Sequence, residues 1–118
     1  MISIDLFRNE DRFQVFARDA LVFSEGEPGD TMYVVLEGSV DLEVKGRTVE
    51  TLGPGGVLGE MTMIDGSARS ATAIVRSDAK LVSIDQPRFK FLVQQTPNFA
   101  LQVMRVLADR LRRMDDRL

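Results

Sequence analysis

The 118-residue sequence predicts a mainly β fold with flanking α-helices, and three observations carry that prediction. Short apolar segments separated by Gly-rich turns recur up to residue 84, which is typical of an antiparallel barrel or sandwich. From residue 85 onward the apolar residues follow a helical period instead. Within the β region, residues 57–75 place Gly-Glu and Arg-Ser-Ala-Thr on either side of a short apolar turn. We therefore expect one domain over residues 1–118, with its own core.

The β region is expected at residues 12–84, after a lead-in segment at residues 1–11 that carries no clear signal. Most of its turns contain Gly or Pro, which supply the positive or fixed φ angles that tight turns require. Lys45-Gly46-Arg47 is the turn of a predicted hairpin. The predicted strands lie, in chain order, at residues 13–17, 21–23, 32–36, 40–44, 48–52, 71–76 and 80–84.

Residues 85–118 are expected to form two helices. Asp85 or Gln86 can precede the first helix, with Pro87 at its first position. Thr96-Pro97 ends this helix, because the residue before a proline is pushed out of the α region.

The second helix is expected from about Asn98 to the end of the chain, with two apolar stripes. Phe99, Val103 and Val106 form the stripe that is expected to pack on the β region. The other stripe has heptad spacing, which suits either pairing with a second helix or packing on the same domain. Its members are Ala100, Met104, Leu107, Leu111, Met114 and Leu118. The outer face is expected to carry Arg105, Asp109, Arg110, Arg112, Arg113, Asp115, Asp116 and Arg117.

Composition excludes several kinds of site. The chain has no cysteine and no histidine, which excludes disulfides, thiol catalysis and metal sites built from these residues. The net charge of -3 gives no indication of nucleic-acid binding. No apolar run approaches the roughly 20 residues that a membrane-spanning helix needs, and the N-terminus lacks the basic start of a signal peptide. We therefore expect a cytoplasmic protein that is not an enzyme and holds no metal.

The stretch from Val57 to Val75 contains two charged side chains that can face one small ligand from two sides. The carboxylate of Glu60 can accept hydrogen bonds from sugar hydroxyl groups, and the guanidinium of Arg69 can bind a phosphate through two hydrogen bonds. A short helix that starts after Gly59 would add backbone N–H donors for an anion. The spacing therefore favours binding of a phosphorylated sugar compound.

These residues resemble the phosphate-binding cassette of the cyclic nucleotide-binding domain family. The family pattern is Gly-Glu, an apolar residue and a short helix, then Arg-Ser or Arg-Ala followed by Ala-Thr. Here it reads Gly59-Glu60-Met61 and Arg69-Ser70-Ala71-Thr72. Glu25–Asp30 and Glu37-Gly38 resemble the family's glycine-rich turns. The resemblance implies an eight-stranded antiparallel β-roll, similar to a jelly roll, with a short helix in the cassette at residues 57–75 and two C-terminal helices.

Two positions depart from the family pattern. Arg18-Asp19-Ala20 stands where the family often has a glycine in the turn before its first Ile/Val-Phe strand, and this departure bears on the geometry of that turn. Leu58 stands where an aromatic residue usually precedes Gly-Glu. The second departure leaves room in the adjacent core but removes no ligand contact.

The resemblance also implies roles for the cassette residues. Arg69 would pair with the cyclic phosphate, and Ser70 would donate to the same group. Glu60 would accept from the ribose 2′-hydroxyl and would help to orient Arg69, while its two neighbours would contribute backbone groups. Thr72 suits a structural strand position as well as a ligand contact. The candidate nucleotide-binding residues are Gly59, Glu60, Met61, Arg69, Ser70 and Thr72.

By the same resemblance, the ligand is a cyclic nucleotide, with cyclic AMP the first choice and cyclic GMP the alternative. The positions that would contact the purine from the last helix fall near Met114 and Asp115, and neither matches a clear adenine-reading pattern. Binding is expected to shift the cassette and the C-terminal helix, as in a sensor or regulatory module.

Expectations about partners are less specific. Residues 98–118 could form the seam of a homodimer. The chain ends at Leu118, before any helix-turn-helix domain of the kind found in related transcription factors, so no DNA-binding element is expected. The chain is either a complete protein or a fragment, and its output partner is unknown. The alternative function is a protein-interaction module of the same fold that binds no ligand and acts through its C-terminal helix.

Overall fold

The computed structural model describes residue 7 and residues 12–116. Of the lead-in segment, only Phe7 lies within the described residues, and its side chain is buried. The strands are β1 (Phe13–Phe16), β2 (Leu21–Phe23), β3 (Thr31–Val44), β4 (Arg47–Leu52), β5 (Val57–Leu58) and β6 (Thr72–Asp85). The helices are α1 (Glu60–Asp65), α2 (Gln86–Gln95) and α3 (Pro97–Asp116).

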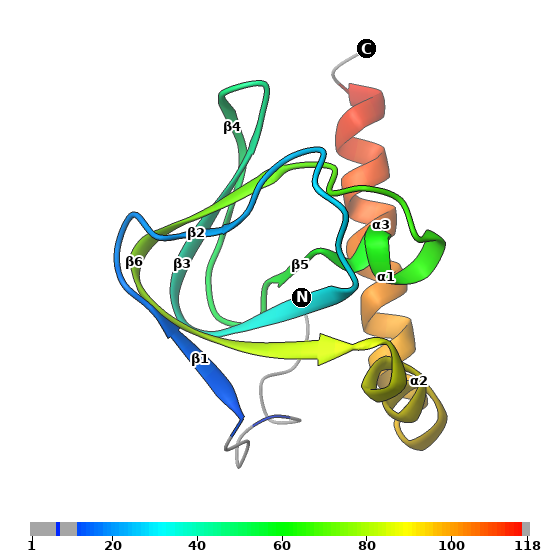
Figure 1. Ribbon diagram of the computed structural model, residues 1–118. Coiled ribbons are helices and arrows are strands. Elements are labelled where there is room, and N and C mark those ends of the chain that lie inside the picture. Colours follow the sequence, from blue (N-terminus) through cyan, green and yellow to red (C-terminus); the bar gives the residue numbers. More distant parts are fainter. Residues whose placement is uncertain (1–6, 8–11, 117–118) are drawn as a thin grey trace.

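The strands form one antiparallel sheet that curls into a roll, and α3 runs along one side of it (Figure 1). The strand order is β1-β6-β3-β4, with β2 also pairing with β6 and β5 also pairing with β3. Lys45 and Gly46 both have positive φ angles, as the predicted hairpin turn between β3 and β4 requires. The predicted fold class, mainly β with flanking helices, is confirmed.

β3 and β6 are longer than the sequence pattern predicts. β3 covers the two strands predicted between residues 32 and 44, and β6 covers the two predicted between residues 71 and 84. Gly38 lies inside β3 with a φ of 84°, and the β3–β6 register shifts on both sides of it. A Cβ at Gly38 would lie 2.3 Å from the carbonyl oxygen of Asp78, so glycine allows the two bends to approach each other. The described residues form six strands, because two predicted breaks are bends within β3 and β6, and the short β5 adds a strand that the residue pattern did not predict.

The turn at residues 18–20 forms without a glycine. Asp19 adopts the left-handed conformation with a φ of 71°, which aspartate tolerates better than most residues. The Asp19 N–H donates to the carbonyl oxygen of Val75 at 2.8 Å, and the Arg18 N–H donates to the carboxylate of Asp78 at 2.9 Å. This departure from the family pattern is therefore accommodated by aspartate in the position that needs a positive φ.

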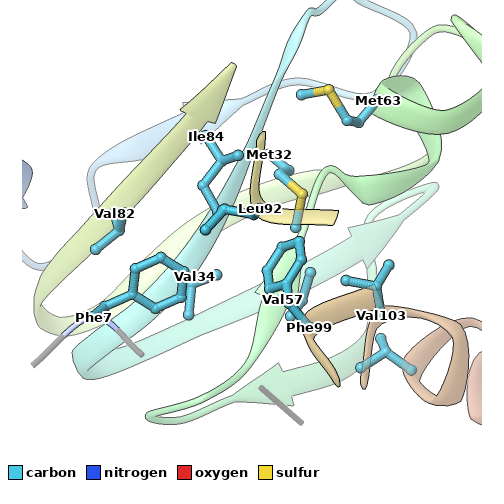
Figure 2. Packing of buried hydrophobic residues seen from close by; sticks show 11 residues of the cluster. Phe7, Met32, Val34, Val57, Met63, Val82, Ile84, Leu92, Phe99 and Val103 are labelled. Carbon is cyan, nitrogen blue, oxygen red and sulfur yellow. The ribbon is translucent and has the colours of Figure 1, made fainter. Parts of the chain in front are cut away.

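The interface between the helices and the roll is apolar. Phe99, Val103 and Val106 of α3 are 1%, 2% and 7% exposed, and they belong to one buried cluster with residues of β3, β5 and β6 (Figure 2). The Phe89 ring of α2 packs edge-on against Phe99, with centroids 6.0 Å apart. The prediction that this stripe of α3 packs on the roll is confirmed.

The predicted start of α2 and the predicted break between α2 and α3 are confirmed to within one residue, whereas the predicted end at residue 118 lies outside the described residues. α2 begins after Asp85, whose carboxylate accepts a hydrogen bond from the Arg88 N–H at 3.0 Å and so caps the helix. α2 ends at Gln95, and α3 begins at Pro97. Proline suits the first position of a helix, where its missing N–H would have no intrahelical partner. None of the described helices has the length and apolar character needed to cross a membrane.

The heptad stripe of α3 divides between the core and the surface. Leu107 packs against the buried cluster, and Ala100 is half-buried. Met104 and Leu111 are both 60% exposed, and Leu101 beside them is 50% exposed. The side chain of Met114 and all of Leu118 lie outside the described residues. An apolar strip therefore remains on the outer side of α3.

Asp41 is a buried carboxylate that links three strands. It accepts a hydrogen bond from the Thr51 hydroxyl on β4 at 2.7 Å and another from the Arg76 Nε on β6 at 2.6 Å. Arg76 also pairs with Glu43 at 3.0 Å. Burial by itself would raise the pKa of Asp41, but the bonds from Arg76 and Thr51 bring that pKa below its usual value. The ionised carboxylate therefore stabilises the folded state.

We expect Asp41→Asn to lower the free energy of unfolding by about 1–3 kcal/mol at neutral pH, because Arg76 loses its buried anionic partner. The pKa of Asp41 is lower in the folded than in the unfolded chain, so its contribution is complete above about pH 4 and is lost as the pH falls through the folded pKa. Urea unfolding at neutral and acidic pH measures both effects. Asp109→Asn, at a site 58% exposed, is the control. A variant with the parent's acid dependence would contradict this account.

Candidate ligand-binding site

A cavity of about 370 Å³ is enclosed by the roll, the cassette and α3. Its size lies within the range of about 300–1,000 Å³ that is typical of small-molecule sites. Strands β2, β3 and β4 contribute one wall, the residues around α1 and Arg69 another, and α3 a third. The apolar side chains that line it are Phe23, Leu42, Val44, Val49, Met61 and Ala71.

The guanidinium of Arg69 lies at this cavity without an anionic partner among the described residues. The residue is 7% exposed, and its Nε is buried and has no hydrogen-bond partner among the described residues. Its Nη1 donates one long hydrogen bond, 3.5 Å, to the carbonyl oxygen of Gly59. A buried charge that is not paired is strongly unfavourable in a folded protein. The arrangement therefore suits an anion bound from the cavity.

The backbone of Arg69 is held by the Gly-rich turn at residues 25–30. The Arg69 N–H donates to the carbonyl oxygen of Glu27, and the Gly26 N–H donates to the carbonyl oxygen of Arg69, both at 2.8 Å. The Gly26 φ of 86° favours a residue without a Cβ. The turn that resembles the family's first glycine-rich turn therefore positions the cassette arginine from a distant part of the chain.

Two glycines and one aromatic ring form a close seat for the guanidinium. A Cβ at Gly29 would lie 2.3 Å from the Nε of Arg69, and a Cβ at Gly59 would lie 2.6 Å from its Nη1. The Cζ of Arg69 lies 4.2 Å from the centroid of the Phe23 ring, which is a cation–π contact. Sequence reasoning did not assign Phe23 or Gly29 to the site. The only local signal for Gly29 was its place in the Glu-Gly-x-x-Gly-Asp segment.

The electrostatic effect of Arg69 extends to Tyr33, which lies beside Phe23 with ring centroids 6.2 Å apart. Burial raises the pKa of the Tyr33 hydroxyl, the charge of Arg69 lowers it, and the carboxylate of Asp30 raises it. The net pKa is above the usual value. Tyr33 therefore stays neutral near the guanidinium and does not neutralise its charge.

Glu60 faces the same cavity but does not contact Arg69. It is 3% exposed, at the start of α1, and its Oε1 accepts a short hydrogen bond from the Nη1 of Arg110. Gly59 before it has a φ of 79°, a left-handed conformation that directs the chain into α1. The prediction that Glu60 helps to orient Arg69 is wrong in this structure, because Arg110 of α3 is its partner.

Arg110 was expected on the outer face of α3, and that prediction is also wrong. Its side chain is 18% exposed and points into the cavity wall, where it contacts three acceptors. Besides Glu60, it donates to Glu50 of β4 through Nε at 3.0 Å and to the carbonyl oxygen of Val57 through Nη2 at 2.5 Å. Burial lowers the pKa of Arg110, but the carboxylates of Glu60 and Glu50 raise it above its usual value. Arg110 is therefore a permanent charge that links α3 to β4 and α1.

The remaining candidate residues differ in whether they line the cavity. Met61 is 43% exposed, and both it and Ser70 line the cavity. The Thr72 hydroxyl accepts a hydrogen bond from the Glu25 N–H at 2.9 Å, and Thr72 does not line the cavity. Within the described residues, no group of three or more potential metal ligands occurs. The structure therefore brings together five of the six candidates and gives Thr72 a contact in the neighbouring turn.

The charged lining of the cavity has a positive surplus. Three guanidinium groups, of Arg69, Arg110 and Arg113, face two carboxylates, of Glu50 and Glu60. Arg113 pairs with Glu50 at 3.3 Å, so both carboxylates are paired from α3. The surplus of one positive charge resides at Arg69, and a ligand with one negative charge would balance it.

Comparison with known proteins identifies the same family as the cassette motif. The model of the family described as "Cyclic nucleotide-binding domain" matches residues 13–96. A CRP-like cAMP-activated global transcriptional regulator from Mycobacterium tuberculosis is 32% identical over 108 residues, which cover 87% of this chain and 48% of the regulator. The chain spans about half the length of the curated relatives it matches.

Solved structures resemble the whole roll and its helices. The catabolite activator protein of Thermus thermophilus is 31% identical, with a TM-score of 0.82 over 95% of this chain and 55% of that protein. A second solved structure, described as "A cyclic-GMP-dependent signalling pathway regulates bacterial phytopathogenesis", is 28% identical, with a TM-score of 0.78 over 94% of both chains. With the matching family model and the cassette geometry, these likenesses lead to one conclusion: this chain belongs to the cyclic nucleotide-binding domain family, and it is related to cyclic AMP receptor proteins.

Proposed function

We propose that this chain is a sensor module that binds a cyclic nucleotide in the cavity and changes conformation on binding. The observation that carries the proposal is the buried guanidinium of Arg69, whose Nε has no hydrogen-bond partner in the part of the chain that the structure describes. A cyclic phosphate carries one negative charge and can accept two parallel hydrogen bonds from a guanidinium. Such a ligand would satisfy Arg69 and balance the charge of the cavity.

The remaining candidate residues fit the other parts of such a ligand. The hydroxyl and N–H of Ser70 would donate to the phosphate beside Arg69. The carboxylate of Glu60 keeps acceptor capacity beyond its bond to Arg110, so it can take a hydrogen bond from a ribose hydroxyl. Backbone groups of Gly59 and Met61 would line the sugar. The apolar wall formed by β2, β3 and β4 would then cover the faces of the base.

Cyclic AMP is the first choice of ligand, with cyclic GMP the alternative. Support for cyclic AMP comes from the relatives, which include cAMP-activated regulators. Support for cyclic GMP comes from the structural likeness to a protein of a cyclic-GMP-dependent pathway. We propose a binding module and not an enzyme, since the cavity contains the groups for holding an anion but no histidine or cysteine for catalysis.

The proposed conformational change would start at Glu60. In the structure, Glu60 bonds to Arg110, so a ribose hydroxyl must share this carboxylate with α3. Binding would thereby favour one position of α3 relative to the roll. A differential affinity for two positions of about 1–3 kcal/mol is typical of allosteric proteins.

Isothermal titration of cyclic AMP, cyclic GMP and 5′-AMP into the chain tests this function, after a denaturing step that removes any carried-over ligand. We expect saturable binding of a cyclic nucleotide and weaker binding of 5′-AMP, whose phosphate is not cyclic and carries more charge. If neither cyclic nucleotide produces heat or a shift in melting temperature, the proposal is wrong. The ligand-free protein-interaction module, acting through α3, would then be favoured.

The exposed strip of α3 supports a second copy of the chain as a partner of this module. Leu101, Met104 and Leu111 are each at least half exposed and lie on one side of the helix at heptad spacing. We propose a homodimer through residues 98–118, in which these side chains face their counterparts. Sedimentation equilibrium of the chain would show a monomer at all concentrations if the proposal is wrong.

A further inference from the structure

We propose that Glu50 is the residue that recognises the purine of the bound nucleotide, by accepting a hydrogen bond from its exocyclic amino group. The inference rests on the proposed function, since it concerns the base of the same ligand. The shared chemistry is an amino group on a purine ring, which is the 6-amino group in adenine and the 2-amino group in guanine. The positions near Met114 and Asp115, expected from sequence to contact the base, offer no clear pattern for this role.

Glu50 lies two strands away from the phosphate end of the cavity. On β4 it pairs with Leu42 of β3, which in turn pairs with Ala73 of β6, four residues after Arg69. Neighbouring strands are about 4.8 Å apart, so Glu50 is about 10 Å across the sheet from Ala73. A ligand anchored by its phosphate at Arg69 would extend along this wall toward Glu50.

The wall between these two points suits an aromatic ring. Leu42, Val44 and Val49 line the cavity beside Glu50 and present only apolar atoms from their side chains. A purine packed on them would leave its polar edge to be satisfied by other groups. Glu50 is positioned to supply the acceptor, because its side chain lines the same cavity and is only 19% exposed.

The other polar groups of the cavity are assigned to other parts of the ligand. Arg69 and Ser70 suit the phosphate, and Glu60 suits the sugar. Arg110 is already bonded to Glu50, Glu60 and the carbonyl oxygen of Val57, and Thr62 belongs to α1. On the β4 side of the cavity, the polar lining is the ion pair of Glu50 and Arg113, 3.3 Å apart. Of these two side chains, only the carboxylate can accept a hydrogen bond, so only Glu50 can recognise an amino group.

Glu50 is held in place and still has acceptor capacity. Its Oε1 accepts from the Nε of Arg110 at 3.0 Å, and its Oε2 accepts from the Nη1 of Arg113 at 3.3 Å. A carboxylate has about four lone-pair sites on its two oxygens, so two sites remain. The two arginines also fix the direction of the carboxylate. The neighbouring guanidinium of Arg113 can donate to the ring nitrogen or carbonyl oxygen that adjoins the amino-bearing edge of a purine.

A cycle of ligand and protein changes tests this assignment. One arm compares cyclic AMP with purine riboside 3′,5′-cyclic monophosphate, which lacks only the 6-amino group. The other arm compares cyclic GMP with cyclic IMP, which lacks only the 2-amino group. Each pair is titrated into the unmodified chain and into Glu50→Leu and Glu50→Gln. Glu37→Leu is the matched control, because Glu37 is 66% exposed and does not line the cavity.

In one of the two arms, removal of the amino group is expected to weaken binding to the unmodified chain about tenfold, as for a hydrogen bond to a charged group. In Glu50→Leu the same removal should change the affinity less than twofold, and Glu37→Leu should behave as the unmodified chain. The arm that shows the coupling identifies the base as adenine or guanine. If Glu50→Leu does not fold, Glu50→Gln gives the same comparison, with a reduced effect of the amino group expected because the charge is lost.

If the role of Glu50 were purely structural, substituting it would weaken the binding of both members of a ligand pair equally. The effects of the ligand change and of the protein change on affinity would then be independent. Equal loss in both arms therefore overturns the assignment while leaving the proposed function intact. If the unmodified chain binds neither cyclic nucleotide, the proposed function and this inference both fail.

Discussion

Arg69→Met is expected to abolish nucleotide binding while leaving the folded domain at least as stable as the parent. The two effects have one cause, which is that the guanidinium is buried without an anionic partner in the described part of the chain. In the complex, it would form charge-assisted hydrogen bonds to the phosphate. Without ligand, it makes one long hydrogen bond to Gly59 and a contact with the Phe23 ring, and these only partly offset the loss of solvation.

The expected loss of affinity is at least about 30-fold, since removing one partner of a buried charged contact typically costs about 2–5 kcal/mol of binding free energy, and every 1.4 kcal/mol is tenfold. The free energy of unfolding should stay the same or rise by about 1 kcal/mol, because methionine fills the space without a buried charge. Titration calorimetry and urea unfolding of the ligand-free chain measure these quantities.

Arg112→Met is the matched control, because the Arg112 side chain is 78% exposed and outside the cavity. This control should bind nucleotide as the parent does. Retention of affinity in Arg69→Met would show that the ligand is anchored elsewhere. A large loss of stability would show that the guanidinium is a structural group of the fold.

Gly29→Ala is expected to reduce binding by at least about tenfold with little change in melting temperature. An added Cβ would lie 2.3, 2.4 and 2.6 Å from the Nε, Cζ and Nη2 of Arg69, which is too close for any of these atoms to stay in place. The end of a flexible arginine can move, whereas the backbone of Gly29 does not need a positive φ. The methyl group should therefore displace the guanidinium from its seat while the turn remains folded.

The choice of position makes this experiment specific. Gly53→Ala is the control, since no atom lies within 4 Å of a Cβ there and its φ is not positive. Gly59 would be a poor choice, because its φ of 79° would add backbone strain to the clash with Arg69. Normal binding by Gly29→Ala would mean that the ligand does not need Arg69 in the observed position. Equal loss in Gly53→Ala would indicate a general effect on the turns.

Local patterns in the sequence were sufficient to predict most elements of the fold. The positions of α2 and α3 follow from Asp85, Thr96-Pro97 and the helical spacing of Phe99, Val103 and Val106, which are features of a few neighbouring residues. The cassette was also visible as a short motif. The ligand chemistry that we propose for it rests on residue types alone, a carboxylate and a guanidinium at fixed spacing.

Local patterns failed where strands bend without ending. Gly38 was read as a strand terminator, but it lies within a continuous β3 because the paired bend in β6 accommodates it. A glycine with positive φ can end a strand or bend it, and only the neighbouring strand decides between these outcomes. The same residue type therefore had two valid interpretations until the pairing of β3 with β6 was seen.

The partners of the charged groups were decided by tertiary structure alone. Arg110 belongs to a charged stretch of α3, yet it bonds to Glu60 and Glu50, which are 50 and 60 residues away in the chain. Likewise, Gly29 and Phe23 form the seat of Arg69 from a turn and a strand far earlier in the sequence. Side-chain spacing predicts which residues share a face of one helix or strand. Which charged groups pair with each other depends on how these elements pack, because only packing brings residues far apart in the sequence within bonding distance.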